Sequence, residues 1–419
     1  MMEHHHKHDQ RKLTSVETAL EKFLSSVNFK PKIEIISLQN ASSRVLAKDV
    51  VSKIEIPSFN KASMDGFAIK SSDTKKAAKN NLVCLKIVGK IFAGERKEKL
   101  IKYGECIAIS TGSLLPNGAD AVIMIEDVLK NNSNIEITKN VKKNSNIALQ
   151  GEEVKKNQLI LKKGTWLTPQ DIGLIASIGM NKIPVFKKPL IGVLATGNEL
   201  TKPGTILKKG KIFESNRIVI SELVKQMGGQ IQDLGICNDN EKTIEKKVKK
   251  GLQNDVLVIT GGSSVGERDF VPKILNNLGK PGIIVKGVAM KPGAPTTLAK
   301  IGKTPVIVCP GFPLSSFFAF FVFGNALLKK MLNTKGPPIS EIEAKMETSI
   351  KTNQKVTNFV RVKIRKTKDG YIARPISTAD SRLLITLTGS DGIVIAKNLK
   401  DLKKGKLVKV ITLRNVSVS

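Results

Sequence analysis

Between residues 190 and 278 the chain alternates apolar runs with amphipathic stretches, and this alternation constrains the fold more than any other feature of the sequence. The apolar runs occupy residues 190–194, 231–236 and 256–260. The stretches with helical spacing occupy residues 217–227, 243–252 and 271–278. Strands that are apolar on both faces are typical of a parallel sheet with helices on either side. We therefore predict a doubly wound, mostly parallel α/β domain that ends with the phenylalanine-rich helix after Pro313.

The regions on either side of this domain have different patterns. Residues 16–24 carry apolar side chains at helical spacing behind Thr14, which is the candidate N-cap. Short runs separated by Gly, Pro and Asn follow between residues 50 and 150 and predict a β-rich module. Thr168 and the proline after it predict the start of another helix. Short alternating strands return beyond the Gly-Pro-Pro break at 336–338, so a small C-terminal β domain is expected.

The chain is strongly basic, with 69 Lys and Arg against 36 Asp and Glu and a formal net charge of +33. A charge of this size raises the hypothesis of nucleic-acid binding. Against this hypothesis, the basic residues are mostly lysines spread over the whole length, and only one Trp and two Tyr could stack on bases. We expect a lysine-rich surface that attracts small polyanions, and nucleic acid is not the expected partner.

Histidine and cysteine usage excludes several kinds of site. All four histidines lie within the first eight residues, so Ser-His-Asp catalysis, Cys-His catalysis and His-ligated zinc have no histidine to use in the core. The four cysteines are far apart and are expected to be reduced, buried thiols of a cytoplasmic protein. No signal peptide or membrane span is expected, because Gly324 and Asn325 interrupt the longest apolar candidate, residues 317–328. Acids, bases and metal ligands must therefore be Asp, Glu, Lys or hydroxyl residues.

The loop after the strand at 256–260 is the first candidate site, because ligands of open parallel sheets bind at the carboxyl ends of the strands. Gly261 and Gly262 let backbone amides approach a phosphate, and the hydroxyls of Ser263 and Ser264 add donors. Asp269 stands at the start of the next helix, where it could hold Mg²⁺ through hard oxygen ligands. The alternative is a tight turn with Asp269 as an ordinary helix cap.

Two further carboxylates and a set of rigid turns are expected at the same edge of the sheet. Glu199 follows the first strand and Asp239 the second, so that with Asp269 three carboxylates converge, although each alone could equally be a helix cap. Turns rich in Pro and Gly follow along the chain and can present backbone to an anion, or can be purely structural. The turn residues of interest are Lys291, Gly293, Pro310, Gly311 and Ser315.

Taken in order, seven segments resemble the molybdopterin molybdenumtransferase family, which includes the C-terminal domain of gephyrin. They read SMDGFA at 63–68, STG at 110–112, GEE at 151–153, TGNE at 196–199, GGSSVGERD at 261–269, KPG at 291–293 and PGFP at 310–313. Any one of these segments is a weak signal, but the set in this order is specific. The resemblance runs from about residue 16 to the C-terminus.

The resemblance implies an enzyme of molybdenum cofactor biosynthesis. Such an enzyme takes adenylylated molybdopterin and molybdate, hydrolyses the adenylate in a Mg²⁺-dependent step with release of AMP, and leaves the metal on the dithiolene. A contact with the molybdopterin adenylyltransferase is expected as well. The resemblance also implies an elongated linker domain (12–50 and 150–183), a β-rich domain (51–149), an α/β domain of the molybdopterin-binding fold (184–334) and a small C-terminal β-barrel (335–419).

Site roles carry over only where this chain matches the family motifs. Carboxylates important for activity are matched by Asp65, Glu199, Asp239 and Asp269, and an active-site hydroxyl by Thr111. Positions associated with the oxyanion pocket are matched by Lys291, Arg361 and Ser381. The family forms an elongated homodimer whose active site lies between the α/β domain of one subunit and the β-rich domain of the other. Asp65 and Thr111 are therefore expected to act in trans.

The chain also departs from the family pattern. Many members have Lys at the position of Ala294, Asn at that of Phe312, Asp at those of Glu153 and Asn198, and Tyr at that of Phe67. Because Ala294 replaces a lysine, the oxyanion pocket has one cation fewer than in those members. Tungstate therefore stays an alternative substrate to molybdate. Two other functions also stay open at this point. The extra terminal domains argue against a molybdopterin adenylyltransferase, and the retained carboxylates argue against a non-catalytic pterin-binding scaffold.

Overall fold

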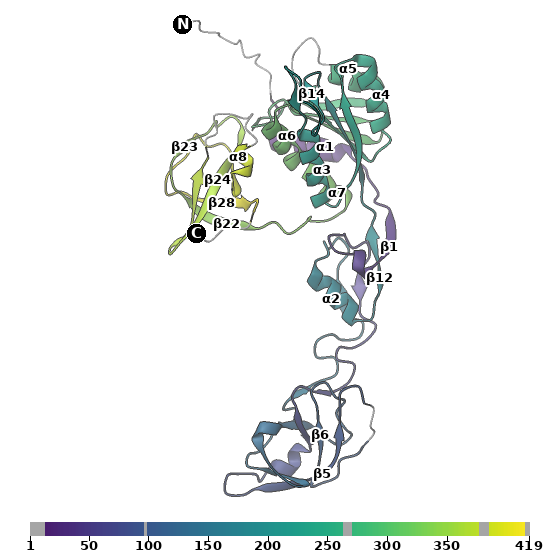
Figure 1. Cartoon of the computed structure of the whole chain (residues 1–419), viewed down its shortest axis with the longest axis vertical. Helices are drawn as coiled ribbons and strands as arrows, with labels where there is room; N and C mark the ends of the chain where they lie inside the picture. The colour runs from purple at the N-terminus through teal and green to yellow at the C-terminus, as the bar shows by residue number, and fades with distance from the viewer. Residues whose placement is uncertain (1–12, 96–98, 263–269, 377–384, 415–419) are drawn as a thin grey trace.

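The protein is elongated in the computed structural model, which describes residues 13–95, 99–262, 270–376 and 385–414 (Figure 1). The β-rich domain lies at one end of the long axis, and the α/β and C-terminal domains lie at the other (Figure 1). Between them, β1 (Ile33–Ser37) pairs antiparallel with β12 (Lys182–Phe186), so the chain leaves the α/β end and returns to it along two adjacent strands. Residues of the β-rich domain are therefore far from the α/β domain of the same chain.

The α/β domain contains a six-stranded sheet with the order β16-β13-β17-β21-β20-β18. The first four strands of this order are parallel: β16 (Gln230–Cys237), β13 (Leu190–Thr196), β17 (Val256–Thr260) and β21 (Thr304–Cys309). The last two are antiparallel: β20 (Thr297–Ile301) and β18 (Pro281–Lys286). The predicted mostly parallel sheet is confirmed, and it carries an antiparallel edge that the sequence pattern did not indicate.

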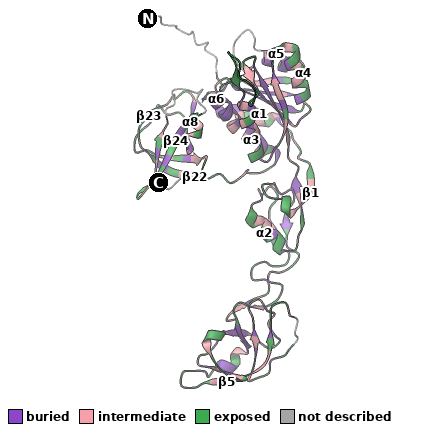
Figure 2. Cartoon of the chain, viewed as in Figure 1, coloured by how far each residue is buried: buried purple, intermediate pink, exposed green. Residues whose placement is uncertain are grey.

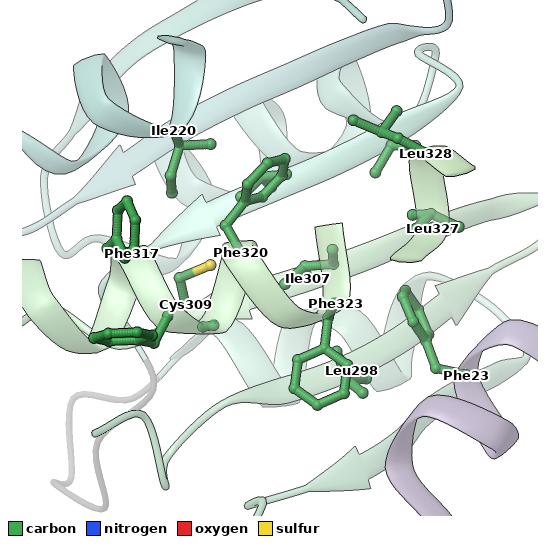
Figure 3. Close-up of a cluster of buried hydrophobic side chains, with 14 of the residues drawn as sticks. Phe23, Ile220, Leu298, Ile307, Cys309, Phe317, Phe320, Phe323, Leu327 and Leu328 are labelled. Carbon is green, nitrogen blue, oxygen red and sulfur yellow. The ribbon is translucent and has the colours of Figure 1, made fainter. Parts of the chain in front are cut away.

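Helices cover both faces of this sheet, as the apolar strands predicted. One face is covered by α4 (Glu241–Gly251) and α5 (Phe270–Leu278), and the other by α3 (Asn216–Gln226), α6 (Pro313–Ala319) and α7 (Asn325–Met331). The second face holds the main core, in which Phe320 and Phe323 pack with Ile307 of the sheet (Figure 3). Burial of these aromatic side chains makes a large apolar contribution to the stability of the domain.

The first helix, α1 (Val16–Ser26), corrects two expectations. Its N-cap is Ser15, whose Oγ accepts a hydrogen bond from Thr18 N at 3.1 Å, whereas Thr14 forms a β-bridge with Val288. The helix was also expected to belong to the linker domain at 12–50. Phe23 of this helix is instead fully buried in the core of the α/β domain (Figure 3). The reason is that the apolar face of α1 packs against the outer strands β18 and β20 and against α7.

The phenylalanine-rich helix is longer than expected. A π-helical segment, Phe320–Gly324, joins α6 to α7 without a break, so the predicted interruption at Gly324 and Asn325 was wrong. Gly324 allows the ring of Phe320 to pack directly against the helix backbone, because a Cβ at this position would lie 2.4 Å from that ring. By length and composition the helix Pro313–Met331 could cross a membrane, but 67% of its most apolar window is buried inside the protein. That burial is the behaviour of a core helix.

The β-rich domain and the linker domain each have a core of their own. The β-rich sheet has the order β7-β4-β6-β5-β9-β8. Its strands are β7 (Ala121–Met124), β4 (Gly66–Ile69), β6 (Glu105–Ile109), β5 (Val83–Ile91), β9 (Asn134–Ile137) and β8 (Val128–Asn131). In the linker, α2 (Pro169–Ser177) begins as predicted, because Thr168 and Asp171 form a capping box and Pro169 occupies the first turn.

The C-terminal domain is a closed β-barrel, which confirms the predicted architecture of this domain. Its order is β24-β25-β22-β28-β26, and β26 pairs back onto β24. The strands are β24 (Thr357–Thr367), β25 (Gly370–Pro375), β22 (Glu341–Met346), β28 (Leu407–Thr412) and β26 (Gly392–Ala396). A two-residue strand of the α/β domain, β19 (Met290–Lys291), pairs in parallel with β24 and attaches the two domains to each other.

The cysteines are free thiols, but one of them is not buried as expected. Cys106, Cys237 and Cys309 are buried, whereas Cys84 on β5 is exposed, because alternate side chains of a strand face opposite sides of the sheet. Burial raises the pKa of the Cys106 and Cys309 thiols to about 12, so these two groups stay protonated and unreactive.

Candidate active site

Four loops meet at the carboxyl edge of the parallel strands, where ligands of such sheets bind. They follow β13, β16, β17 and β21, and they occupy residues 197–199, 238–240, 261–262 and 310–312. Backbone hydrogen bonds tie them together: Gly197 N donates to Cys237 O at 3.0 Å, and Gly261 N donates to Cys309 O at 3.1 Å. The side chain of Asn216 also donates to Gly311 O at 2.7 Å. The edge is therefore a fixed platform rather than a set of independent loops.

Glycines at this edge allow the backbone to pack closely against neighbouring atoms, and they leave the backbone amides without side chains that would keep a ligand away. A Cβ on Gly261 would lie 2.4 Å from Thr196 O, and one on Gly262 would lie 2.5 Å from Val271 Cγ2. The buried hydroxyl of Thr196 lies beside both glycines and has no hydrogen-bond partner among the described residues. An unpartnered buried hydroxyl next to an open loop is suited to donate to a bound anion. The predicted residues Ser263, Ser264 and Asp269 lie outside the described part of the chain.

The close approach at Gly261 gives a stability prediction. Gly261→Ala should lower the free energy of unfolding of the α/β domain by more than the roughly 1–2 kcal/mol that a left-handed alanine costs, because Cβ would also meet Thr196 O. Gly302→Ala is the matched control, since Gly302 has φ +58° but nothing within 4 Å of its Cβ position. Calorimetry of the two variants measures the difference, and equal losses would contradict the close-approach argument.

The two described carboxylates of the predicted metal set lie on adjacent loops. Asn198 and Asp239 bind each other reciprocally, with Asn198 N donating to Asp239 Oδ2 and Asp239 N donating to Asn198 Oδ1, both at 3.1 Å. Neither carboxylate is a helix cap, because Asn240 caps α4 and Glu199 precedes the short strand β14 (Leu200–Thr201). The capping alternative is therefore excluded for Glu199 and Asp239.

Whether a third carboxylate completes this set stays a prediction. Within the described ranges, no group of three or more His, Cys, Asp or Glu is placed to hold a metal. The expected third member, Asp269, falls in the stretch that is not described. Glu199 and Asp239 nevertheless supply the hard anionic oxygens that Mg²⁺ prefers, so their chemistry fits this ion.

Asp65 and Thr111 contact each other in the β-rich domain, although 46 positions separate them in the sequence. Thr111 donates twice to Asp65 Oδ1, through its backbone N at 2.6 Å and through its Oγ1 at 2.8 Å. These two hydrogen bonds hold the pKa of the exposed Asp65 carboxyl below its ordinary value. Asp65 directly precedes β4 of the β-rich domain, whereas Glu199 directly precedes β14 of the α/β domain. These two domains lie at opposite ends of the molecule (Figure 1), so the two groups of residues do not meet within one chain.

The Thr111 contact gives a titration prediction. Thr111→Val keeps the backbone donor and removes the hydroxyl donor, so the pKa of Asp65 should rise toward its ordinary value, and protonation during an acid titration should begin at a higher pH. A carboxyl group whose folded pKa is depressed adds stability above its unfolded pKa, and this stability is lost as the pH falls through the folded pKa. Carboxyl NMR measures the pKa directly. Thr111→Ser retains a hydroxyl and should titrate like the wild type; identical curves for Val and Ser would contradict the assignment.

The predicted oxyanion residues Lys291 and Arg361 line one small cavity between the α/β domain and the barrel. Pairing of β19 with β24 puts Lys291 opposite Asn358, three residues before Arg361. Arg361 is only 2% exposed, and burial lowers the pKa of its guanidinium. Gly293 shapes the turn after Lys291, because it has φ +114° and a Cβ there would lie 2.8 Å from Met290 Cε. Ser381, the third predicted member, lies outside the described residues.

The remaining predicted residues follow β21. Pro310 and Gly311 border the glycine loop, and the Cβ position of Gly311 lies 4.0 Å from Gly261 Cα. Ser315 is buried in α6 with an exposed fraction of 4%, so it lies behind the loop rather than on its open side. Phe312, one of the departures from the family pattern, is 54% exposed and could contact a ligand or a second subunit.

Sequence reasoning missed two residues that the structure brings to these places. Thr196 stood inside a quoted motif without a role, and only its burial without a partner draws attention to its hydroxyl. Lys351 lines the same cavity as Lys291 and Arg361. No local pattern distinguishes Lys351 from the many other lysines, because its position is decided by the pairing of its strand with residues about 50 positions further along the chain, at Asp401.

The fold and the candidate site place this chain in a class of multidomain proteins. In this class a doubly wound domain carries a glycine-lined loop and carboxylates at the carboxyl edge of its sheet. Family models match nearly the whole chain. They are the MoeA N-terminal region (domain I and II) at residues 14–179, the probable molybdopterin binding domain at 192–330 and the MoeA C-terminal region (domain IV) at 343–413.

Individual relatives agree with these matches. The molybdopterin molybdenumtransferase of Staphylococcus epidermidis is 32% identical over 410 residues, which is 96% of each chain. That of Haemophilus influenzae is 33% identical over 325 residues, or 77% of this chain and 79% of the relative. The crystal structure of a molybdopterin biosynthesis MoeA protein from Pyrococcus horikoshii superimposes with a TM-score of 0.80 at 31% identity, covering 96% of this chain and 100% of that one. The chain belongs to the molybdopterin molybdenumtransferase family.

Proposed function

We propose that this protein is a transferase of molybdenum cofactor biosynthesis that inserts molybdenum into adenylylated molybdopterin, with Mg²⁺-dependent release of AMP. Its relatives are named molybdopterin molybdenumtransferase, and its central domain matches a molybdopterin-binding family model. The observation that carries the proposal is the carboxyl edge of the sheet, where the loops with Asp239, with Glu199 and with Gly261 and Gly262 follow three adjacent parallel strands. Amides and carboxylates at one edge suit a ligand that carries phosphates and a divalent cation.

Different residues of this chain would bind the two substrates, the adenylate and the oxyanion. Backbone amides of the glycine loop and the Thr196 hydroxyl would bind the phosphates of the adenylate. Glu199 and Asp239, with Asp269, would hold Mg²⁺, which supplies positive charge to the phosphate oxygens when it is bound. Lys291 and Arg361, with Ser381, would bind molybdate or tungstate, because a dianion favours charge-assisted hydrogen bonds from such donors.

Asp65 would act in hydrolysis as a carboxylate supplied in trans. Its low pKa keeps it ionised near neutral pH, so it can accept a hydrogen bond from the water that attacks the adenylate phosphorus. The phosphoanhydride bond breaks, the oxygen of the attacking water becomes part of AMP, the molybdopterin phosphate leaves with the bridging oxygen, and the proton of the water is released to solvent. This role requires a homodimer in which the β-rich domain of one subunit reaches the α/β domain of the other.

The proposal extends to the surroundings of the enzyme. Free thiols at all four cysteines, with Cys84 exposed, suit a reducing compartment, so we place the protein in the cytoplasm. The adenylate is a reactive intermediate, so a contact with the molybdopterin adenylyltransferase that supplies it would limit its loss to water. Both statements belong to the proposal and not to the family assignment.

One assay tests the reaction and its metal requirement together. Purified protein, adenylylated molybdopterin and molybdate should release AMP only when Mg²⁺ is present, and chelation of Mg²⁺ should stop the release. Chromatography measures AMP, and a parallel reaction with tungstate measures selectivity. Absence of AMP release from the complete mixture would overturn the proposed function, whereas release that is unaffected by chelation would overturn only the metal requirement.

A further inference from the structure

We propose that Lys351 is an oxyanion-binding residue, and that it supplies the positive charge that a lysine at position 294 provides in many family members. This inference rests on the proposed function, because it names a further contact of the molybdate substrate. Its starting point is the cavity already described. Besides Lys291 and Arg361, the charged residues that line this cavity include Lys351, and the rest of the lining is Pro292, Thr352, Asn358, Phe359 and Val360.

Among the described residues, the lining has three cations and no carboxylate, so these side chains favour an anion. Asp401 is the cross-strand neighbour of Lys351 in the pairing of β23 (Ile350–Lys351) with β27 (Asp401–Leu402). No ion pair joins Lys351 to Asp401 in the structure, and Lys351 takes part in none of the ion pairs found among the described residues. The Lys351 ammonium is therefore available to a ligand.

Lys351 is also held in place by the backbone around it. The turn that follows it is fixed by Asn358, whose Nδ2 donates to Asn353 O at 2.8 Å and to Val356 O at 2.9 Å, while its Oδ1 accepts from Asn353 N at 3.1 Å. On the other side, Thr352 N donates to Lys400 O at 3.0 Å. Asn358 is also the register partner of Lys291 in the pairing of β19 with β24. Its side chain therefore fixes the turn after Lys351, and its backbone lies opposite Lys291.

Position 294 explains why this chain needs the charge. Ala294 follows Lys291 by three residues in the turn closed by the hydrogen bond from Val288 N to Ala294 O at 2.9 Å. Its methyl group is absent from the cavity lining and carries no charge. A pocket with only Lys291 and Arg361 would have two cations for a dianion, and Lys351 restores a third from the barrel side. The donor therefore comes from a different domain in this chain.

Equilibrium dialysis with molybdate alone tests the proposal without the pterin substrate. We expect Lys351→Met to weaken molybdate binding at least tenfold, as loss of a charge-assisted hydrogen bond does. Lys351→Arg should bind close to the wild type. The double variant with Lys351→Met and Ala294→Lys should recover most of the affinity, because a lysine three residues after Lys291 returns a positive charge to the turn that borders the pocket.

A matched control is available on the same turn. Lys355 is exposed and does not line the cavity, so Lys355→Met removes the same charge nearby and should leave the affinity unchanged. Wild-type affinity in Lys351→Met, or a loss that Ala294→Lys leaves in place, would overturn the proposal. If the wild type binds molybdate and depends on Lys351 but releases no AMP with the pterin substrate, the proposed function fails while this inference stands.

Discussion

Asp239→Asn should reduce AMP release from adenylylated molybdopterin by roughly 100-fold or more, because it removes one anionic ligand from the proposed Mg²⁺ site. The fold should be unaffected. The asparagine carbonyl can still accept the hydrogen bond from Asn198 N, and the backbone N of residue 239 can still donate to the Asn198 side chain. A Mg²⁺ titration should show that the remaining activity needs a higher metal concentration.

A substitution of a nearby residue distinguishes loss of a metal ligand from loss of one negative charge in the same region. Glu241→Gln removes the same charge two residues away, where the side chain pairs with Lys273 at 2.9 Å on the surface. Surface pairs of this kind contribute little, so this variant should keep near-wild-type activity. If Asp239→Asn matched Glu241→Gln in both activity and Mg²⁺ requirement, Asp239 would not be a metal ligand.

The second large effect concerns stability. Phe323 is fully buried in the core between the sheet and the long helix (Figure 3), so Phe323→Ala should lower the free energy of unfolding by about 3–5 kcal/mol. The cost combines the lost transfer free energy of the ring with the cavity it leaves, and neighbours such as Leu298 close such a cavity only in part. The calorimetric transition of the α/β domain should shift down by roughly 10 °C.

Phe312→Ala is the control for the same type of substitution. Its side chain is 54% exposed at the start of α6 and makes no capping hydrogen bond, so the change should cost within about 1 kcal/mol. Calorimetry of both variants under one set of conditions compares them directly. Equal shifts would mean that the helix 313–331 does not stabilise the domain through its buried face.

Local rules predicted the parts of this fold whose determinants lie close together in sequence. The apolar run at 256–260 is β17, entirely buried, and the Thr168-Pro169 start of α2 has the expected capping box. Both follow from side chains within a few residues of each other. Such signals also located the glycine loop and three of the barrel strands, β24, β26 and β28, but not β22 or β25.

The predictions that were wrong concern residues whose structure depends on contacts with parts of the chain that are distant in sequence. Ser15 rather than Thr14 caps α1, because Thr14 pairs with Val288, more than 270 positions away. Gly324 looked like an interruption but permits close contact with the ring of Phe320 inside a continuous helix. Cys84 is exposed because of the face that its strand position presents. Periodicity alone carries none of this information.

In the candidate site, too, some features could be predicted from local sequence and others could not. Loop composition identified Gly261, Gly262, Glu199 and Asp239 as neighbours, since the ends of parallel strands meet at one edge. The family resemblance assigned Asp65 and Thr111 to the active site, but their spacing gave no signal of the direct contact that the structure shows. Figure 2 shows each domain with its own buried interior and exposed surface, which is why the fold of one domain says nothing about which domain of a partner would meet it.

The central claim is that one active site is built from two subunits, and a mixed dimer tests it most directly. Asp65→Asn and Asp239→Asn subunits carrying different affinity tags are co-expressed, and the mixed dimer is purified through both tags. In a site shared between subunits, the mixed dimer has one site with both carboxylates intact. The account predicts that it regains about half of wild-type AMP release, whereas each parental homodimer is nearly inactive. A mixed dimer no more active than its parents would contradict the account.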